Sequence, residues 1–522
     1  MAPAGTIPAL LTALASARPD TDAACFPTSR STFAQLEAAS LAKARALRAA
    51  GIGAGDLVGL LMAAGLAEIE LLAGLWYVGA VPVPINPRYK PPELAYVVEH
   101  SRMELLVCDA AGMALAAQAG VACPVVVVSD DGGFPASAGL ADPDDVARLS
   151  AAVTPGDDAI VLYTSGTTSN PKGAIHTHAG LVAEGRNVAA RLGLGPGDRF
   201  WSALPLFHCG GYCTMMAAWA AGATFVHPGA FEAGIALAQL EGEQCTFAFP
   251  AFEMIWLAAL DHPSYATADL SALRVVVNVG VPERLRQMQE RMPGIVQISS
   301  FGSTESCGFI CIGDVNDPLE ARVTTSGRIL PGMELRIVDP ETGEEAELGQ
   351  PGEALFRGVT RFSRYHRDPV HTSKVIDAEG WFHSGDLVSC DEEGRIRFEG
   401  RLKDMLKVGG ENVSPAEVED YLLTHPAVGL AQVVAAPDAR LIEVPCAFVQ
   451  LAPGATVTQE ELIEYCLGRI ATFKVPRYVR FVADWPMSGT KIQKHRLRER
   501  IAAELREAGI TAAPRLTSTV RA

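Results

Sequence analysis

The sequence contains no Cys-x-x-Cys pair, and its 11 cysteines follow no regular spacing. Zinc sites and disulfide frameworks both depend on such spacing, so we expect neither. Reduced thiols are typical of a cytoplasmic protein, which is the location we predict. The first residues also lack a basic segment followed by an unbroken apolar stretch. We therefore expect no signal peptide.

Basic charge is also scarce. The 43 Lys and Arg residues are outnumbered by 60 Asp and Glu residues, and the net charge is −17. Because a nucleic-acid-binding surface needs an excess of positive charge, we expect no nucleic-acid partner. The segment 469–500 departs from this average, since it is rich in Lys and Arg and contains only Asp484 and Glu499 as acids. This segment favours either a small polyanionic ligand or a solvated helix face.

Long hydrophobic runs are missing as well. The longest apolar region, 57–85, is interrupted by Glu68, Glu70 and several glycines. It predicts buried helix and strand rather than a transmembrane segment. The chain has 522 residues, of which 49% are hydrophobic and 20% charged. This is an ordinary globular composition, long enough for roughly three or four domain-sized units.

The first 150 residues alternate between helical and strand-like patterns. We expect helices at 32–50 and 66–77, and strands at 57–62, 80–85, 105–108 and 121–128. A further buried strand is expected at 159–163, and the same rhythm continues to about residue 300. Such alternation predicts an α/β fold of mostly parallel sheets covered by helices.

The pattern changes after residue 325. Short strands at 334–338, 353–357 and 395–399, separated by turns, predict a mainly antiparallel subdomain. A compact α+β unit follows, with helices starting at Pro415 and spanning 459–470, and strands at 431–435, 445–450 and 478–482. We therefore predict an N-terminal domain of residues 1–403 and a C-terminal domain of residues 404–522.

The segment 163–173 (Tyr-Thr-Ser-Gly-Thr-Thr-Ser-Asn-Pro-Lys-Gly) is the most informative stretch. A buried strand running into a loop of hydroxyl side chains and glycine offers many O–H and N–H donors, which suits phosphate oxygens. Lys172 adds a positive charge for the outer phosphates. The spacing differs from a Walker A loop. The alternative is a solvated Ser/Thr turn. The candidate phosphate ligands are Thr164, Ser165, Gly166, Thr167, Thr168 and Lys172.

Further motifs follow in order along the chain. They are Leu-Pro-Leu-Phe-His at 204–208, Ser-Phe-Gly-Ser-Thr-Glu at 300–305, Gly-Trp-Phe-His-Ser-Gly-Asp-Leu at 380–387, Gly-Arg-Leu-Lys-Asp at 400–404 with Gly-Gly-Glu-Asn at 409–412, and Pro-Met-Ser-Gly-Thr-Lys-Ile-Gln-Lys at 486–494. With the phosphate-binding segment, this set resembles the ANL superfamily of adenylate-forming enzymes. The resemblance covers roughly residues 30 to 500.

The resemblance implies a luciferase-like fold, with a large N-terminal domain and a small, mobile α+β C-terminal domain. It also implies a ligase that uses ATP, Mg²⁺ and coenzyme A. A carboxylic acid and ATP give an acyl-adenylate and pyrophosphate. The thiol of coenzyme A then attacks the acyl carbon, which gives acyl-CoA and AMP. Fatty- and aryl-CoA ligases, enzymes of fatty acid metabolism, are the branch that residues 407–413 resemble most.

The resemblance assigns roles within the nucleotide site. Thr304 would bind the α-phosphate and Glu305 would coordinate Mg²⁺. Phe301, followed by Gly302, would stack on adenine, whose other side would be lined by the backbone of Gly280, Val281 and Pro282. Asp386 would accept hydrogen bonds from the ribose hydroxyls, and Arg401 would reach ribose and phosphate. Outside this context Glu305 would be an ordinary surface carboxylate and Phe301 a core aromatic residue.

The catalytic lysine of the family corresponds to Lys491, which would offset the negative charge that develops during adenylation. Lys494 is the fallback, because the segment Gly489-Thr490-Lys491 is one residue shorter than the family pattern. A second departure is Ser169, where the family loop has glycine. His208 would steer carboxylate or pyrophosphate at the mouth of the acyl site, with a structural histidine as the alternative.

The resemblance also implies two arrangements of the C-terminal domain, related by rotation about a hinge at Asp404. The second arrangement would bring Gly409 and Gly410 towards a pantetheine tunnel, with Lys474 and Arg477 near the phosphates of coenzyme A. Acyl-pocket candidates are Phe207, Tyr212, Phe249 and Asn278. Asn278 replaces a smaller residue of the family. These mostly apolar positions favour a monocarboxylic fatty, alicyclic or aryl acid.

Other functions remain open at this stage. An adenylating enzyme that loads a carrier protein, or a luciferase-like relative, is the main alternative. A non-enzymatic ATP sensor would leave Lys491 and Glu305 without a role. The sequence does not decide between a monomer and a homodimer.

Overall fold

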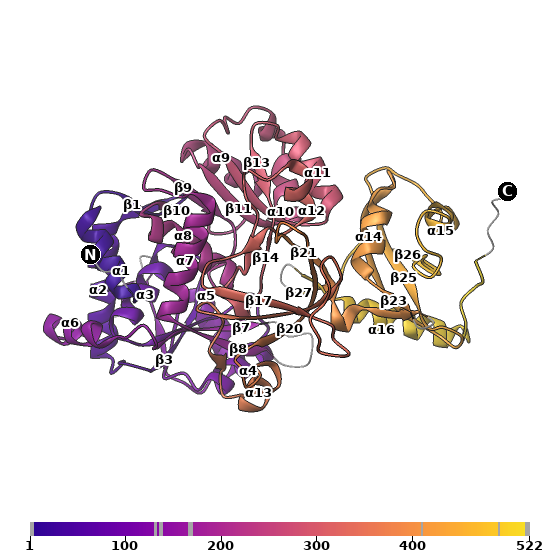
Figure 1. The fold of residues 1–522 in the computed structure, drawn as a ribbon. Helices are drawn as coiled ribbons and strands as arrows, with labels where there is room; N and C mark the ends of the chain where they lie inside the picture. Colours follow the sequence, from indigo (N-terminus) through magenta and orange to yellow (C-terminus); the bar gives the residue numbers. More distant parts are fainter. Residues whose placement is uncertain are drawn as a thin grey trace. The chain divides into compact units, whose positions relative to one another are not determined.

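The computed structural model describes residues 5–129, 133–134, 139–164, 171–408, 411–488 and 491–516. The chain forms two compact units. The first comprises Met1–Gly280, Gln287–Leu335 and Phe356–Phe382, and the second comprises Val281–Arg286, Arg336–Leu355 and His383–Ala522. Figure 1 follows the chain by colour and labels its elements.

The first unit contains a seven-stranded sheet. Its order is β13 (Val296–Ile298), β12 (Val275–Val279), β11 (Phe247–Phe252), β9 (Arg199–Ser202), β10 (Thr224–Val226), β1 (Asp22–Phe26) and β2 (Ser29–Thr32). Every neighbouring pair is parallel except β1 and β2. The parallel arrangement follows from the helices that connect successive strands.

A second sheet in this unit is fully parallel. Its order is β4 (Val81–Pro84), β3 (Leu57–Leu61), β5 (Leu105–Cys108) and β6 (Val125–Val127). The first unit's helices before residue 160 are α1 (Ile7–Ala17), α2 (Phe33–Ala49), α3 (Leu66–Tyr77), α4 (Pro91–Ser101), α5 (Ala110–Ala119) and α6 (Pro143–Ala152). Together these elements confirm the expected α/β class.

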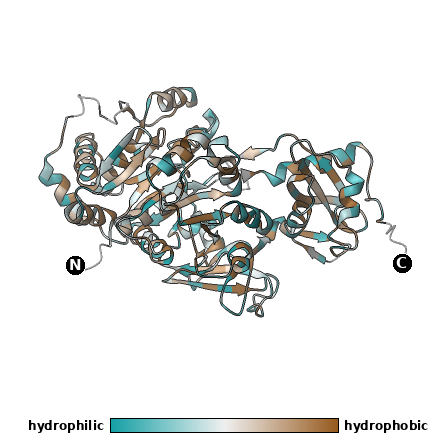
Figure 2. Cartoon of the chain, turned by 90° about the horizontal axis from the view of Figure 1, so that it is seen from above, coloured by the Kyte–Doolittle hydropathy of each residue, from teal (hydrophilic) through white to brown (hydrophobic). Residues whose placement is uncertain are grey.

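Local sequence signals explain where the helices begin and how closely they pack. Thr32 and Gln35 form a reciprocal capping box at the start of α2, with 3.3 Å from Gln35 N to Thr32 Oγ1 and 3.0 Å from Thr32 N to Gln35 Oε1. Helices α2 and α3 pack closely at Gly74, where a Cβ would lie 3.0 Å from the carbonyl oxygen of Ser40. Figure 2 shows hydrophilic and hydrophobic residues on the same helices, as expected for helices that cover a sheet on one side.

Two small antiparallel sheets complete the first unit. One has the order β19 (Arg364–Tyr365), β8 (Lys172–Thr177) and β7 (Asp158–Thr164), and the other β14 (Ser300–Phe301), β15 (Cys311–Ile312) and β16 (Arg328–Ile329). The strand expected at 159–163 therefore lies in an antiparallel hairpin. The remaining helices of this unit are α7 (His178–Leu192), α8 (Cys209–Ala221), α9 (Ala233–Gly242), α10 (Glu253–Leu260), α12 (Leu319–Thr324) and α13 (Pro369–Val375).

The strand-rich segment expected after residue 325 forms a four-stranded sheet. Its order is β17 (Met333–Val338), β18 (Gly352–Gly358), β20 (Phe382–Cys390) and β21 (Ile396–Arg401), and most of these residues belong to the second unit. Helix α11 (Pro282–Arg291) spans the point at which the two units are divided.

The rest of the second unit is an α+β fold, as expected. Its sheet has the order β23 (Glu411–Val413), β22 (Leu406–Val408), β25 (Ile442–Leu451) and β24 (Val428–Asp438), with β26 (Tyr478–Phe481) also paired to β25. Strands β27 (Met487–Ser488) and β28 (Lys491–Ile492) pair with each other, and the helices are α14 (Pro415–Leu423), α15 (Gln459–Cys466) and α16 (Lys494–Glu507). Asp404 lies within this unit, so the predicted boundary there stays a prediction.

Two expected elements are shorter than predicted by four or more residues. The strand expected at 121–128 is only Val125–Val127, and the helix expected at 459–470 ends at Cys466. The helix ends because Leu467 is extended and Gly468 has a φ of 71°, which starts a turn. Hydrophobic composition alone does not reveal such a stop.

Candidate functional site

The segment 163–173, which is predicted to bind phosphate, includes the last residues of β7 and the first residues of β8. Thr164 and Lys172 face each other across this hairpin, and Thr164 Oγ1 donates a hydrogen bond of 3.4 Å to the Lys172 carbonyl oxygen. The structure therefore brings these two predicted phosphate ligands together. The other four, Ser165, Gly166, Thr167 and Thr168, lie outside the described residues, as does Ser169.

Helix α4 contacts this hairpin at Tyr163 and at Pro171. The Tyr96 hydroxyl donates to the Pro171 carbonyl oxygen at 3.2 Å, and His100 Nδ1 lies 2.8 Å from the Tyr163 hydroxyl. Burial lowers the pKa of His100, which favours the neutral imidazole. Sequence reasoning missed Tyr96 and His100, because neither belongs to a recognisable motif.

Glu305 lies in a short 3₁₀ turn, Thr304–Ser306, directly after β14. Its Oε1 accepts a 2.8 Å hydrogen bond from the Tyr365 hydroxyl, and its carbonyl oxygen accepts a 2.7 Å hydrogen bond from the Phe362 N–H. The Lys172 ammonium lies 5.3 Å from the centre of the Tyr365 ring. Tyr365 therefore contacts both the predicted metal ligand and the predicted phosphate ligand.

Thr304, Phe301 and Gly302 lie in the same turn and strand. Thr304 Oγ1 contacts Cys209 Sγ at 3.7 Å, and the Phe301 side chain is buried. At Gly302 a Cβ would lie 2.0 Å from the Gly308 carbonyl oxygen. Gly302 is thus required by close backbone packing, which the motif alone did not explain.

The acyl-pocket candidates lie in three different elements. Phe207 and His208 pack with 4.6 Å between ring centres just before α8, and Tyr212 is fully buried within that helix. Phe249 on β11 packs against Phe309 with 5.0 Å between ring centres. His208 is the N-cap residue of α8.

Asn278 faces a polar cluster. Its Nδ2 donates to Gln297 Oε1 at 3.0 Å. Val277, its neighbour on β12, packs instead into the main hydrophobic core together with Phe249. Asn278 is the register partner of Ala251 on β11, beyond an irregularity between Ala248 and Ala251, so simple alternation does not relate its face to that of Phe249. The assignment of Asn278 to the acyl pocket stays a prediction.

The predicted adenine-lining segment spans the division between the two units. Gly280 belongs to the first unit, where a Cβ would lie 2.6 Å from Glu253 Oε2. Val281 packs with the hydrophobic core of the second unit, and Pro282 begins α11. A side chain at position 280 would thus displace Glu253.

Asp386 and Arg401, the predicted ribose ligands, belong to the second unit. They are cross-strand partners on β20 and β21, and Arg401 Nε lies 2.8 Å from Asp386 Oδ1. Ser384 Oγ accepts a 3.0 Å hydrogen bond from the Asp386 N–H and donates a 2.6 Å one to the Ala354 carbonyl oxygen. Gly385 has a φ of 68°, a conformation that favours glycine.

The catalytic-lysine candidates lie next to α16. Lys491 begins β28, but its side chain lies outside what the structure describes. Lys494 Nζ forms a 2.6 Å ion pair with Glu419 Oε1, and the Glu419 side chain is only 8% exposed. Lys494 is therefore engaged in holding α16 against α14. This contact describes Lys494 alone, and the assignment of Lys491 as the catalytic lysine stays a prediction.

The hinge and coenzyme A candidates are partly described. Asp404 Oδ1 lies 3.9 Å from Arg498 Nη2, and Lys474 Nζ lies 2.5 Å from Glu417 Oε1. Gly409 and Gly410 lie outside the described residues.

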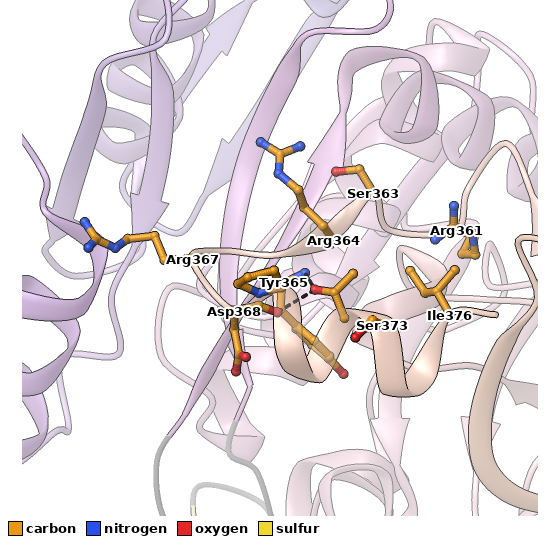
Figure 3. Close-up of a pocket in the computed structure, with 10 residues that line it drawn as sticks. Arg361, Ser363, Arg364, Tyr365, Arg367, Asp368, Ser373 and Ile376 are labelled. Carbon is orange, nitrogen blue, oxygen red and sulfur yellow. Dashed lines mark hydrogen bonds between the residues drawn. The ribbon is translucent and has the colours of Figure 1, made fainter. Parts of the chain in front are cut away.

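A pocket of about 450 Å³ opens beside β19 and α13 (Figure 3). Arg361, Arg364 and Arg367 are among its lining residues, but their guanidinium groups point in different directions in Figure 3. Arg364 is paired with Asp158 at 2.6 Å, and Arg361 donates to the Phe362 carbonyl oxygen. The arginines therefore do not converge on one anion.

Two features are absent from the described part of the chain. It contains no group of three or more His, Cys, Asp or Glu side chains that could together hold a metal ion. Within the same residues, no helix is long and apolar enough to cross a bilayer.

Comparison with known proteins identifies the family. Residues 11–366 match the AMP-binding enzyme family, and residues 417–491 match the AMP-binding enzyme C-terminal domain. A Rhodococcus jostii 3-[(3aS,4S,7aS)-7a-methyl-1,5-dioxo-octahydro-1H-inden-4-yl]propanoyl:CoA ligase is 34% identical over 90% of this chain and 94% of its own length. The medium-chain fatty-acid–CoA ligase of Escherichia coli is 33% identical over 91% of this chain and 86% of its own length.

Solved structures agree with this result. The anthranilate CoA ligase AuaEII, in complex with anthranoyl-AMP, has a TM-score of 0.85 at 28% identity, over 96% of this chain and 98% of that one. The chain therefore belongs to the AMP-binding enzymes, the adenylate-forming ANL superfamily. Within this family it is an ATP-dependent, AMP-forming acyl-CoA synthetase.

Proposed function

We propose that the chain activates an apolar monocarboxylic acid of the fatty, alicyclic or aryl type and transfers it to coenzyme A. The observation that carries this proposal is the contact of Tyr365 with both Glu305 and Lys172. A carboxylate and an ammonium group held beside the same ring suit a metal-bound polyphosphate. The two CoA ligases compared above are named for a propanoate that carries an octahydroindene ring system and for medium-chain fatty acids, which supports an apolar acid.

In the first half-reaction, a carboxylate oxygen of the acid attacks the α-phosphorus of ATP. The bond from this phosphorus to the bridging oxygen breaks, and pyrophosphate leaves. Lys172 and Thr164 would bind the outer phosphates, and Thr304 the α-phosphate. Lys491 would offset the negative charge that develops between acid and phosphate. Asp386 and Arg401 would fix the ribose.

Mg²⁺ fits this set of residues. The described residues contain no group of three or more His, Cys, Asp or Glu side chains that could hold a metal ion. The ligands of the cation would be Glu305 and phosphate oxygens. This is the usual way in which Mg²⁺ binds in nucleotide sites. When bound, it neutralises phosphate charge during the displacement. Glu305 supplies one carboxylate oxygen for it.

In the second half-reaction, the thiol sulfur of coenzyme A attacks the acyl carbon and AMP leaves with the electron pair of the broken C–O bond. We propose that Asp404 is the hinge about which residues 404–522 rotate between the two half-reactions, and that Gly409, Gly410, Lys474 and Arg477 contact coenzyme A. The acid would pack against Phe207, Phe249 and Tyr212, with His208 at the mouth. A cytoplasmic location also stays a prediction, and the choice between a monomer and a homodimer stays open.

An ATP–pyrophosphate exchange assay on a panel of carboxylic acids tests this function. AMP release and acyl-CoA formation should be measured with and without coenzyme A. We expect exchange with apolar monocarboxylic acids and thioester formation only with coenzyme A present. Exchange without any CoA thioester would indicate a carrier-loading enzyme instead. If no acid supports either exchange or AMP release, the proposed function is wrong.

A further inference from the structure

Tyr365 is held rigidly by its backbone. It lies on β19, opposite Ala174 of β8, and its N–H donates a 3.0 Å hydrogen bond to Thr372 Oγ1. The neighbouring residue His366 donates its N–H to the Gly173 carbonyl oxygen at 2.7 Å. Tyr365 as a whole residue is only 6% exposed. Because both strand pairing and helix α13 fix this residue, its hydroxyl has a defined position.

The Tyr365 hydroxyl meets one particular oxygen of Glu305. It donates to Oε1 at 2.8 Å, while the Glu305 backbone is fixed separately by the Phe362 N–H. A glutamate side chain has several rotatable bonds, so without such a donor its carboxylate would sample many orientations. The hydrogen bond uses Oε1 and leaves Oε2 as the oxygen available to a ligand. A hydrogen bond to a ligating carboxylate is a common way to orient it.

Lys172 adds a second link. Its strand, β8, pairs with the strand that carries Tyr365, and its ammonium group lies over the ring of Tyr365 at 5.3 Å from the centre. The same aromatic side chain therefore touches a cation suited to phosphate and a carboxylate suited to Mg²⁺. The rigid side chain of Tyr365 therefore sets the distance between the Lys172 ammonium and the Glu305 carboxylate, whose own side chains are flexible.

We propose that Tyr365 is a positioning residue that orients Glu305 towards the divalent cation of MgATP. The inference rests on the proposed function and deepens it. Tyr365 does not touch the reacting atoms. It acts through Glu305, so its loss should weaken the metal-dependent part of ATP binding and leave metal-free ATP binding intact.

Binding of ATP to the full chain by isothermal titration calorimetry tests this directly. Titrations with Mg²⁺ and with EDTA are compared, both without acid, for the parent and for Tyr365→Phe. We expect Tyr365→Phe to weaken MgATP binding about tenfold or more, the range known for residues that orient metal ligands. Binding of metal-free ATP should stay within about twofold of the parent. Unchanged MgATP affinity would overturn the inference.

A double-mutant cycle separates orientation from a general structural effect. Glu305→Gln should lose most of the Mg²⁺-dependent affinity, and adding Tyr365→Phe to it should cost little more, because the two residues act as one unit. If the two losses multiply instead, Tyr365 does not act through Glu305. Tyr265→Phe is the matched control, since it removes a hydroxyl that donates to the Arg291 carbonyl oxygen at 2.9 Å elsewhere in the first unit. It should change neither affinity.

A second variant tests the same inference if Tyr365→Phe fails to fold. Glu305→Asp keeps the charge but withdraws the carboxylate by one methylene, so the Tyr365 hydroxyl no longer reaches it. It should show the same selective loss of MgATP affinity, and an unchanged affinity would count against the inference. Failure of the proposed function would give a different binding result. A parent chain that binds ATP equally well with Mg²⁺ and with EDTA would overturn the Mg²⁺ site itself, and the role of Tyr365 with it.

Discussion

Asp386 and Arg401 form a cross-strand ion pair, with 2.8 Å between Asp386 Oδ1 and Arg401 Nε. The Asp386 side chain is 4% exposed and the Arg401 side chain 41% exposed. A buried carboxylate of this kind is oriented before any ligand arrives, because its partner lies directly opposite on the neighbouring strand. The Asp386 carboxylate is the acceptor of this pair and would accept hydrogen bonds from two adjacent hydroxyl groups.

Asp386→Asn should therefore raise the KM for ATP by about 10- to 100-fold, because hydrogen bonds to a charged acceptor contribute roughly 1.5–3 kcal/mol. Steady-state kinetics with varied ATP measures this. Glu334→Gln is a matched control, because it removes the carboxylate of another Arg–carboxylate pair, with Arg357 at 2.8 Å. An equal rise in KM for both variants would contradict a direct role of Asp386.

Gly302→Ala should reduce kcat/KM by at least about 100-fold. The added Cβ would lie 2.0 Å from the Gly308 carbonyl oxygen and 2.8 Å from Phe309 Cα, so the turn that carries Glu305 must shift. A misplacement of about 1 Å can lower the reaction rate by about 100-fold. At Gly294 a Cβ would meet no atom within 4 Å, so Gly294→Ala should leave kcat/KM unchanged. Equal activity of the two variants would show that the turn tolerates the shift.

Lys491→Ala should abolish adenylation and leave thioester formation from supplied acyl-adenylate largely intact. The reason is electrostatic, because Lys491 would offset charge only in the first half-reaction. Pyrophosphate exchange measures the first step, and acyl-CoA formation from synthetic acyl-adenylate measures the second. Survival of both half-reactions would show that the lysine is wrongly assigned.

Lys494→Ala should behave differently. It leaves Glu419 without its ion-pair partner, although Glu419 Oε1 still accepts a 2.6 Å hydrogen bond from the Val433 N–H. We expect a loss of stability of about 1–3 kcal/mol, seen as a lower thermal midpoint of the C-terminal domain. Both half-reactions should fall together rather than one alone. A selective loss of adenylation would instead make Lys494 the catalytic lysine.

Glu184 makes stability depend on pH. This fully buried carboxyl accepts a 2.8 Å hydrogen bond from the Phe309 N–H, and burial raises its pKa from 4.5 to about 8. The folded state therefore holds a proton that the unfolded state releases above pH 4.5, so stability is lost as the pH rises from 4.5 towards 8. Burial raises the pKa of the Cys213 and Cys307 thiols, and the Glu184 carboxyl raises it further.

Glu184→Gln should remove this pH dependence. Between pH 5 and pH 8, the free energy of unfolding of the variant relative to the parent should rise by an amount on the order of 4 kcal/mol. Denaturant midpoints measured across this range check the slope. A constant difference between the two proteins would mean that Glu184 does not titrate between these pH values.

The sequence predicted the α/β class and most strand and helix positions, because hydrophobic periodicity and capping residues act locally. The helix expected at 66–77 is α3, and the helix expected at 32–50 is α2. The end of α15 at Cys466 was missed, since a left-handed Gly468 is a conformational choice that composition does not reveal. The motifs also marked Thr164, Lys172 and Glu305 before their contacts were known.

Tyr365, Tyr96 and His100 could not be found in this way. Tyr365 reaches Glu305 from a position 60 residues further along the chain, and Tyr96 reaches the Pro171 carbonyl oxygen across 75 residues. Neither residue carries a chemical signature, because a tyrosine is more often part of a core than of a site. Asn278 shows the reverse case, since its contact with Gln297 depends on the face of β12 on which it lies.

The sequence by itself determined the chemistry of this protein, because the identity and order of hydroxyl, carboxylate and lysine side chains in its motifs are local and readable. Only the tertiary structure decided which of these side chains are held in place and by what. The reason is geometric. Strand pairing places Tyr365 near Lys172 and Asp386 opposite Arg401, and the turn after β14 brings Glu305 to the Tyr365 hydroxyl. No spacing along the chain encodes these distances.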